Sequence, residues 1–366
     1  MERGADRRAD YKLLAGFALI LIFGLVMLTS IGSAVGHERF NDSYFFIKRQ
    51  LLFGVLPGIV LFFFFAKFDY QRLKKIGGWI FALSLVLLLL VFIPGIGSNY
   101  GTHAKSWLTI FDYSFQPAEF AKLGLVIFLS FLISRSRNLD YFKTGFLPVL
   151  GIGMIPVLLV IAQPDIGTVS ILFAILFGLL FVGRANIWHI IALALCGIIV
   201  LGAMVWAAPY RVARLTVFLH PELDPQGIGY HTNQAFLAIG SGGILGRGFG
   251  HSLQKFQYLP EVWADSIYAV IAEEMGFIVA VGVIVLLLFI AWRGILIAKK
   301  APDEFGRLLV SGIIIWLITQ SFLNIGAMVG IMPLTGVPLP FVSHGGTALM
   351  VAMASVGIIV NVSKRV

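Results

Sequence analysis

Acidic residues at the edge of an apolar run, and inside it, are the first feature of this sequence that could do chemistry. The stretch YLPEVWADSIYAVIAEEMGF, residues 258–277, carries Glu261, Asp265, Glu273 and Glu274 and continues as IVAVGVIVLLLFIAW. Burying a carboxylate in hydrocarbon costs several kcal/mol or forces the group to take up a proton. The chain must therefore hold these carboxylates with partners, or use them.

Asp265 has two interpretations. It begins the apolar run, where an aspartate is a favoured helix N-cap whose charge suits the helix dipole. It could instead be an external carboxylate on the rim of a membrane cavity, suited to general-base catalysis. Glu273 and Glu274 follow about 12–14 Å deeper along a helix, and a buried structural or polar-network role is expected for both.

A second candidate lies in SFQPAEFAKLGLVIFL, where Pro117 suits the first turn of a helix. Glu119 and Lys122 are then three residues apart on one face and can pair. The pair is either a salt bridge that makes the Lys tolerable in a span, or an intramembrane functional site that opens outward. Both interpretations stay open.

The remaining polar motifs are weaker. Asp165 in QPD occupies an external turn before a helix, as an N-cap does. His220, His231 and His251 share one segment, but their spacings of 11 and 20 match no compact zinc motif, so no metal site is expected there. The glycine-rich run 240–250 matches no nucleotide-binding motif and predicts a compact turn or re-entrant segment, or a close approach of backbone amides to a phosphate.

The composition indicates what must position these residues. The chain of 366 residues is 59% hydrophobic and 12% charged, with a mean hydropathy of +0.94. These values predict an all-α polytopic membrane protein that forms a single domain over 1–366. Residues 1–11 are expected to form a cytoplasmic tail. Residues 208–264 are expected to form a large external loop between the seventh and eighth helices. Its one cysteine, Cys196, can form no intramolecular disulfide. Ten transmembrane helices are expected, at 12–34, 50–66, 76–95, 117–134, 145–162, 166–183, 187–207, 265–292, 307–331 and 344–362.

The basic residues predict the orientation. If the N-terminus is cytoplasmic, 18 of the 27 Lys and Arg residues fall on inside segments, eight fall on outside segments and one, Lys122, lies in a span. The positive-inside rule therefore places both termini in the cytoplasm. The scattered basic residues suit contact with anionic membrane lipids, and they form no stripe that would bind nucleic acid.

Five motifs in order resemble one family. The stretches QPAEFAK, AQPDIGT, DPQGIGYHTNQAFLAIGSGGILGRGFGHSLQKFQYLPE, DSIYAVIAEEMGF and TGVPLPFVSHGGTALM are similar to those of the SEDS family (shape, elongation, division and sporulation), to which FtsW and RodA belong. The resemblance covers essentially the whole chain. The segments GHSLQKFQYLPE and FFIKRQLL favour the FtsW branch, which serves division, over RodA, which serves elongation.

The resemblance implies a peptidoglycan glycosyltransferase that polymerises lipid II at the outer face of the bacterial cytoplasmic membrane, together with a class B penicillin-binding protein. The family's essential aspartate falls on Asp265 and its intramembrane pair on Glu119 and Lys122. Asp265 would be the base, Glu119 would orient Lys122, and Lys122 would offset the pyrophosphate charge. An external Arg or a divalent cation, Mg or Mn, is the alternative for that charge, and no organic cofactor is implied. Substrate contacts are expected at Glu261 and Asp165, which match motif positions, and at the external Lys48, Arg49 and Arg211.

The chain departs from the family pattern at two places. Trp263-Ala264-Asp265-Ser266 stands where many members have His-Thr-Asp-Phe, and Ser343-His344-Gly345-Gly346-Thr347 stands where many have Ser-Tyr-Gly-Gly-Ser. The aspartate is kept, but any role of the preceding His does not transfer. Two other functions remain alternatives, a lipid II flippase and a non-catalytic scaffold of the division machinery.

Overall fold

Long helices run through almost the whole described chain. The computed structural model describes residues 9–98, 104–110, 113–136, 139–207, 209–220, 223–224, 226–227, 229–256 and 258–366; most of the predicted tail and single positions of the predicted external loop lie outside these residues.

The elements are α1 (Tyr11–Phe40), α2 (Phe45–Gln50), the π-helical turn η1 (Leu51–Val55), α3 (Leu56–Lys67), α4 (Tyr70–Leu90), β1 (Gly97–Ser98), β2 (Trp107–Ile110), β3 (Tyr113–Phe115), α5 (Pro117–Arg135), the π-helical turn η2 (Phe142–Phe146), α6 (Leu147–Ala162), α7 (Ile166–Val182), α8 (Ile187–Trp206), α9 (Pro209–Leu219), α10 (Tyr230–Gly242), α11 (Ile267–Lys300), α12 (Glu304–Met328) and α13 (Gly346–Ser363).

The ten expected helices are all present. Within the described residues, nine helices are long and apolar enough to cross a membrane. The tenth, α7, is apolar but has 17 residues. The protein is thus an integral membrane protein of the predicted helical class. The largest difference in bounds is at α11, which begins at Ile267 and continues to Lys300, beyond the predicted end at 292.

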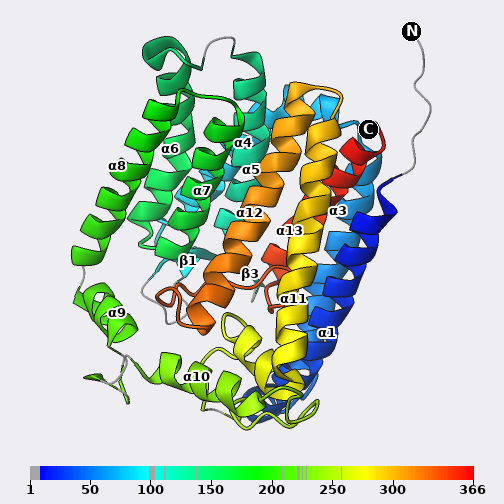
Figure 1. Cartoon of the computed structure of the whole chain (residues 1–366), viewed down its shortest axis with the longest axis vertical. Coiled ribbons are helices and arrows are strands. Elements are labelled where there is room, and N and C mark those ends of the chain that lie inside the picture. The colour runs from blue at the N-terminus through cyan, green and yellow to red at the C-terminus, as the bar shows by residue number, and fades with distance from the viewer. Residues whose placement is uncertain are drawn as a thin grey trace.

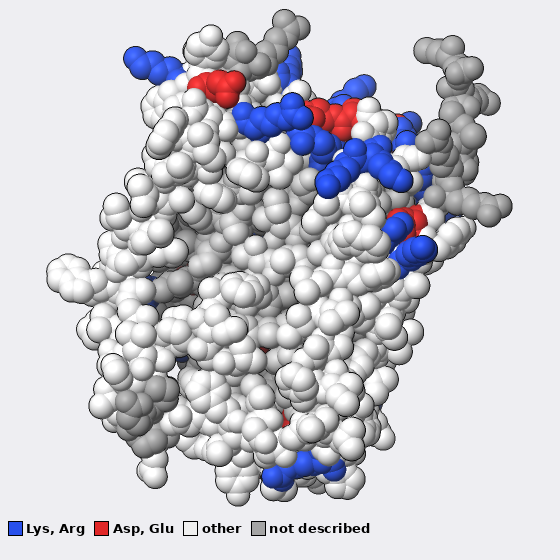
Figure 2. All heavy atoms as spheres, viewed as in Figure 1, with Lys and Arg blue, Asp and Glu red and all other residues white. Residues whose placement is uncertain are grey.

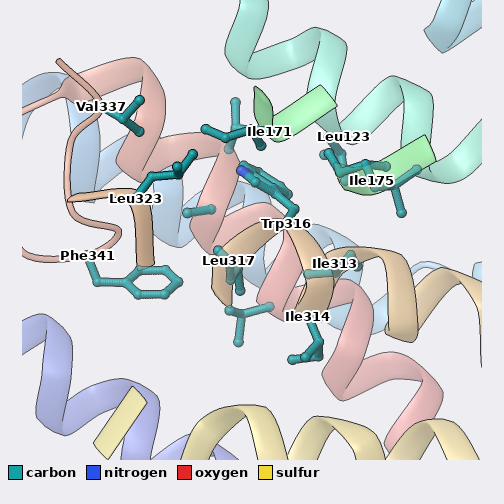
Figure 3. Close-up of a cluster of buried hydrophobic side chains, with 14 of the residues drawn as sticks. Leu123, Ile171, Ile175, Ile313, Ile314, Trp316, Leu317, Leu323, Val337 and Phe341 are labelled. Atoms are coloured by element: carbon teal, nitrogen blue, oxygen red, sulfur yellow. The ribbon is translucent and has the colours of Figure 1, made fainter. Parts of the chain in front are cut away.

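Helices α5, α12 and α13 form the centre of the bundle and α8 lies at its periphery. The most apolar window of α13 is 83% buried and that of α12 is 67% buried, whereas the window of α8 is only 22% buried. Figure 3 shows the apolar side chains that converge around α12, drawn from α5, α7 and the segment before α13. They include Leu123, Ile171, Ile175, Ile313, Trp316, Leu317, Leu323, Val337 and Phe341.

Small residues let two central helices approach closely. A Cβ at Gly58 of α3 would lie 2.5 Å from the sulfur of Met353, and a Cβ at Gly357 of α13 would lie 2.5 Å from the backbone oxygen of Phe62. Such contacts are tighter than any side chain at these positions allows. Glycine is therefore required where α3 crosses α13, as is common between helices in membranes.

Two features were not predicted from the sequence. A small antiparallel sheet in the order β1-β2-β3 pairs Leu108 with Phe115 and Ser98 with Trp107, because the loop between α4 and α5 turns back on itself. The second feature is a break inside α11 at Gly276, where φ is 78° and ψ is 179°. This backbone conformation favours glycine.

The two ends of the bundle differ in charge. The start of α1 and the C-terminus lie at one end of the molecule, and α9 and α10 lie at the other (Figure 1). On the face shown in Figure 2, Lys and Arg gather at the end that carries the C-terminus. This asymmetry agrees with the orientation that the positive-inside rule predicts.

Candidate active site

Asp265 lies in the turn before α11 and does not cap this helix. The N-cap residue is Ser266, which makes no side-chain capping hydrogen bond. The N-cap interpretation of Asp265 is therefore wrong. The partly buried carboxylate accepts a 3.3 Å hydrogen bond on Oδ1 from the hydroxyl of Ser266.

The surroundings of Asp265 stabilise its protonated form relative to its ionised form more than water does. Burial raises the pKa of Asp265 to about 6, although the Ser266 hydrogen bond and the charge of Arg214 act in the opposite direction. A carboxyl with a pKa close to neutral pH is suited to taking up and releasing a proton. Asp265 can thus act as a general base once it is ionised.

The backbone around Asp265 is held by α12 and by the segment that precedes α13. Asn324 of α12 donates through Nδ2 to the carbonyls of Asp265 and Val337, at 2.7 and 2.8 Å. From the other side, the Ser343 hydroxyl donates to the Ala264 carbonyl. These uncharged contacts fix the position of the carboxylate without neutralising it.

Glu119 and Lys122 form the predicted pair. The Lys122 ammonium lies 2.8 Å from both Glu119 carboxylate oxygens, and the Lys122 side chain is only 1% exposed. It also donates to Gln320 Oε1 at 2.7 Å and lies over the Trp316 ring at 5.2 Å. Beside Glu119, a small enclosed cavity lined by Gln320 and Pro338 has room for about one water molecule.

Glu119 and Lys122 are linked to Asp265 through side chains of α12 and not by direct contact. Gln320, whose Oε1 accepts from Lys122, donates through Nε2 to the Pro338 carbonyl at 2.9 Å. One helical turn further along α12, Asn324 binds Val337 and the backbone of Asp265. The structure thus joins the two predicted groups in one hydrogen-bonded network. It does not place the Lys122 ammonium at an open surface, where the hypothesis of pyrophosphate contact requires it.

The structure gives three of the other predicted residues partners within the chain. Asp165 caps α7 by accepting from the Thr168 amide and hydroxyl at 2.9 and 2.8 Å, which confirms its interpretation as an N-cap. Arg211 donates to the Met204 carbonyl at 2.7 Å. Lys48 pairs with Asp42 at 2.7 Å on the surface. None of these three lies in the network around Asp265.

Glu261 and Arg49 act on groups in or beside the turn that carries Asp265. Glu261 has a φ of 48°, and its pKa is raised by burial and then by the charge of Asp265. Arg49 lies over the rings of Phe45 and Phe53. Burial, and then the charge of Arg49, lowers the pKa of His344 to about 4, so His344 is neutral at physiological pH.

Comparison with known proteins identifies the family of this chain. A family model described as "Cell cycle protein", which covers FtsW, RodA and SpoVE, matches residues 11–366. The chain belongs to the FtsW/RodA/SpoVE family. The predicted resemblance to the SEDS proteins is thereby confirmed.

Individual FtsW/RodA/SpoVE relatives match over nearly the full length. The chain is 40% identical over 349 residues to stage V sporulation protein E of Bacillus subtilis (strain 168), with 94% of each chain covered. It is 39% identical over 363 residues to a probable peptidoglycan glycosyltransferase FtsW of Nitrosococcus halophilus (strain Nc4), with 98% of this chain and 93% of the relative covered.

Two solved structures share the fold. The rod shape determining protein RodA of Thermus thermophilus matches with a TM-score of 0.70 at 26% identity, covering 97% of this chain and 96% of that one. A chain from a peptidoglycan synthase complex that coordinates polymerization and crosslinking matches with a TM-score of 0.80 at 27% identity, covering 98% of each.

Two departures from the family pattern meet in space. Trp263 stacks on Phe46 with ring centroids 4.8 Å apart, and His344 meets the same Phe46 ring edge-on at 5.3 Å. The His344 amide also donates to the Trp263 carbonyl at 2.8 Å, and the Arg39 guanidinium lies 5.1 Å above the Trp263 ring. The unusual residues on the two sides of Asp265 therefore pack as one cluster.

Three residues near Asp265 were missed by the sequence reasoning. Arg214 of α9 acts electrostatically on Asp265 and His231, and His231 Nε2 lies 2.6 Å from the hydroxyl of Ser266. These interactions join residues 17 to 51 positions apart across loops, where no periodic pattern signals proximity. The sequence pointed to Ser266 only through its adjacency to Asp265 and its departure from the family pattern.

Glu273 and Glu274 have the predicted structural role. Glu273 accepts from the Ser252 hydroxyl and the Leu253 amide. Glu274 accepts from Ser30 of α1 at 2.8 Å and pairs with Lys255 at 3.0 Å. Both glutamates thus fasten the loop after α10 to α11, beside the break at Gly276. In this loop the glycine-rich run forms the predicted compact turn, with positive φ at Gly243, Gly246, Gly248 and Gly250.

Metal ligands do not converge in the described part of the chain. Among these residues, no three His, Cys, Asp or Glu side chains lie together as a metal site requires. The predicted external histidines are separated: His231 contacts Ser266, whereas His251 lies against the Phe249 carbonyl on the surface.

Proposed function

We propose that this chain is a peptidoglycan glycosyltransferase that polymerises lipid II into glycan strands at the outer face of the cytoplasmic membrane. Its full-length similarity to a probable peptidoglycan glycosyltransferase FtsW supports the reaction class. The fold match to a chain of a peptidoglycan synthase complex supports a partner that crosslinks, and we assign this role to a class B penicillin-binding protein. The assignment to the FtsW branch, which serves division, over RodA, which serves elongation, stays a prediction.

The environment of Asp265 carries the proposal. Its carboxylate has no helix-capping duty, its backbone is fixed by Asn324 at 2.7 Å, and burial raises its pKa to about 6. A scaffold has no use for a partly desolvated carboxylate that costs stability in its ionised form. A base that must accept a proton from a sugar hydroxyl needs these properties.

The reaction that we assign to Asp265 balances as follows. The 4-hydroxyl oxygen of one lipid-linked disaccharide forms a bond to the anomeric carbon of another, and its proton passes to Asp265. The bond from the anomeric carbon to the pyrophosphate oxygen breaks, and the lipid pyrophosphate leaves with the electron pair. Asp265 then releases the proton to water, which restores the ionised base.

The departing pyrophosphate needs positive charge, and we assign that role to Arg214. The Arg214 side chain is exposed and acts electrostatically on Asp265. Lys122 is buried, and its ammonium is engaged by Glu119 and Gln320. We therefore propose that Glu119 and Lys122 are positioning residues that hold the Pro338 segment through Gln320. A Mg or Mn ion would arrive with the pyrophosphate, and we assign it no protein ligands.

We also propose that Asp265 faces the outside of the cell, with both termini in the cytoplasm. The end that carries α9 and α10 lies opposite the C-terminus (Figure 1), and basic residues gather at the C-terminal end (Figure 2). In a Cys196→Ser background, a cysteine at the exposed Phe256 should react with a membrane-impermeant thiol reagent in intact spheroplasts. Protection of this cysteine until lysis would reverse the orientation.

The function is tested with purified wild-type chain, a class B partner and lipid II in sealed vesicles. We expect glycan strands of several disaccharides, which gel electrophoresis separates by length. Lipid II should be consumed only in the leaflet on the side of Asp265. Movement of lipid II between leaflets without glycan formation would instead identify a flippase. Neither product, from a correctly assembled complex, would favour the scaffold alternative.

A further inference from the structure

The Ser266 hydroxyl has a single proton and three polar neighbours. Ser266 is fully buried, and its Oγ lies 2.6 Å from His231 Nε2, 2.8 Å from the Pro260 carbonyl and 3.3 Å from Asp265 Oδ1. This residue is also one of the positions at which the chain departs from the family pattern. Neither the helix cap nor the packing accounts for a hydroxyl here.

Proton counting assigns a direction to these hydrogen bonds. The Pro260 carbonyl can only accept, and an ionised Asp265 can only accept, so at most one of these two oxygens can receive the single Ser266 proton. When one of them does, His231 has to donate from Nε2. The reverse arrangement, in which Ser266 donates to His231, would leave both oxygens without that donor and the negative charge less stabilised.

His231 is suited to be a permanent donor. Burial, and then the charge of Arg214, lower its pKa to about 4, so the ring stays neutral at physiological pH. A neutral ring with its proton on Nε2 donates to Ser266 at every pH at which the enzyme would work. The direction of these hydrogen bonds therefore does not change through protonation of His231.

We propose that His231 and Ser266 are positioning residues for Asp265: His231 donates to Ser266, Ser266 donates to Oδ1, and Oδ2 is left for the substrate hydroxyl. This inference rests on the proposed function only for the identity of the substrate. Gly336 lies beside Oδ2: a Cβ at this position would be 3.9 Å from this oxygen, an ordinary van der Waals distance.

The same hydroxyl can follow the proton through one turnover. When Oδ2 takes the proton from the sugar hydroxyl, the negative charge of Asp265 disappears and its attraction for the Ser266 proton weakens. The Ser266 proton then turns to the Pro260 carbonyl, 2.8 Å away. When Oδ2 releases its proton to water, the Ser266 proton returns to Oδ1 and the starting state is restored.

The other groups that face Asp265 are unchanged when the pair is altered. Arg214 from α9 acts electrostatically on Asp265, and Asp265 in turn acts on Glu261 of the preceding turn. From α12 it meets only the uncharged amide of Asn324, and the nearby His344 is neutral because its pKa is about 4. A change at Ser266 or His231 therefore reports on the hydrogen bond to Oδ1.

The protonation of Asp265 can be measured without substrate. A hydrophobic carbodiimide reacts with protonated carboxyl groups, and mass spectrometry of the Asp265 peptide gives the labelled fraction as a function of pH. In the intact chain we expect half-maximal labelling near pH 6. Ser266→Ala and His231→Leu should each raise this midpoint by about one unit, because a hydrogen bond to the charged form favours that form.

Two further variants separate positioning from general disruption. His231→Gln keeps an N–H donor and should bring the midpoint back to that of the wild type. The double variant Ser266→Ala/His231→Leu should shift it no further than Ser266→Ala alone, since both changes remove one interaction. His251→Leu, a change on the same external segment but away from Asp265, is the matched control and should leave the midpoint unchanged.

An unshifted midpoint in Ser266→Ala, or additive shifts in the double variant, would overturn the inference. Parallel glycan assays with a class B partner distinguish it from the function. If the midpoints shift as expected but the wild type makes no glycan, the positioning pair stands and the glycosyltransferase proposal fails. If glycan forms and the midpoints do not move, the function stands and the pair has no positioning role.

Discussion

At the scale of single residues, the properties of Asp265 come from what surrounds it and not from its type. Burial raises its pKa to about 6, while Ser266 and Arg214 limit the rise. The raised pKa means that the folded protein holds this proton more tightly than the unfolded chain does. Asp265 therefore contributes to stability at low pH, and this contribution is lost as the pH rises through about 6.

The pH dependence of polymerisation follows from this raised pKa. A general base works only when it is ionised, so the initial rate at low substrate should increase tenfold per pH unit below about pH 6 and level off above it. The measurement is the initial rate of glycan formation between pH 5 and pH 8.5 with the same class B partner. A rate that is flat down to pH 5 would show that no group with the raised pKa of Asp265 takes the proton.

At the scale of elements, α12 connects the buried pair to the active site. Lys122 and Gln320 lie 198 positions apart in the sequence and meet at 2.7 Å, and Gln320 and Asn324 hold neighbouring carbonyls of one segment. The Glu119–Lys122 contact could be predicted because both residues lie on one turn of one helix. The contact with Gln320 could not, because helix periodicity says nothing about which helices become neighbours.

Gln320→Leu tests this connection. The change leaves the Pro338 carbonyl, the Lys122 ammonium and the Trp316 indole N–H each without one buried partner, and each group left unpaired should cost about 1–3 kcal/mol of stability. We expect a lower melting temperature and at least a tenfold loss of polymerisation at an unchanged lipid II affinity. Ser321→Ala is the matched control, because Ser321 only donates to Leu317 within the same helix. Full activity of Gln320→Leu would remove Glu119 and Lys122 from the positioning network.

The loop after α10 is fastened to α11 and α1 by a second buried pair. Lys255 lies 3.0 Å from Glu274, and both side chains are nearly inaccessible. Lys255→Met leaves a buried carboxylate without its cation and should lower the free energy of unfolding by about 3–5 kcal/mol. Adding Glu274→Gln should recover a large part of this loss, as measured by thermal unfolding of the purified variants.

The exposed ion pair of Lys48 and Asp42 is the control for the buried pair of Lys255 and Glu274. Lys48→Met should leave the free energy of unfolding nearly unchanged, because surface ion pairs contribute little. Equal losses for Lys255→Met and Lys48→Met would contradict the claim that the loop depends on a buried charge pair.

At the scale of the whole molecule, the sequence predicted the helices well and their junctions poorly. Hydropathy located all ten expected helices, nine of them long enough to cross a membrane and the tenth, α7, shorter, because burial in lipid requires long apolar runs. The break at Gly276 left no such signal, since its neighbours are apolar on both sides, and the β1-β2-β3 sheet is too short to produce a pattern. The candidate active site also lies at a junction, the turn before α11. Asp265 was predictable from its motif, whereas its contacts with Ser266, His231 and Arg214 were not.

The central claim is that Asp265 is the general base of a lipid II polymerase, and Asp265→Asn tests it most directly. Asn keeps the shape of the side chain but cannot accept the proton, so we expect glycan formation with a class B partner to fall by about 100-fold to 10,000-fold. The variant should melt at or above the wild-type temperature at pH 7.5, because it lacks the partly desolvated charge. Asp69→Asn, at an N-cap that Asn also supports, is the control and should polymerise normally. Wild-type rates from a correctly folded Asp265→Asn would contradict the account.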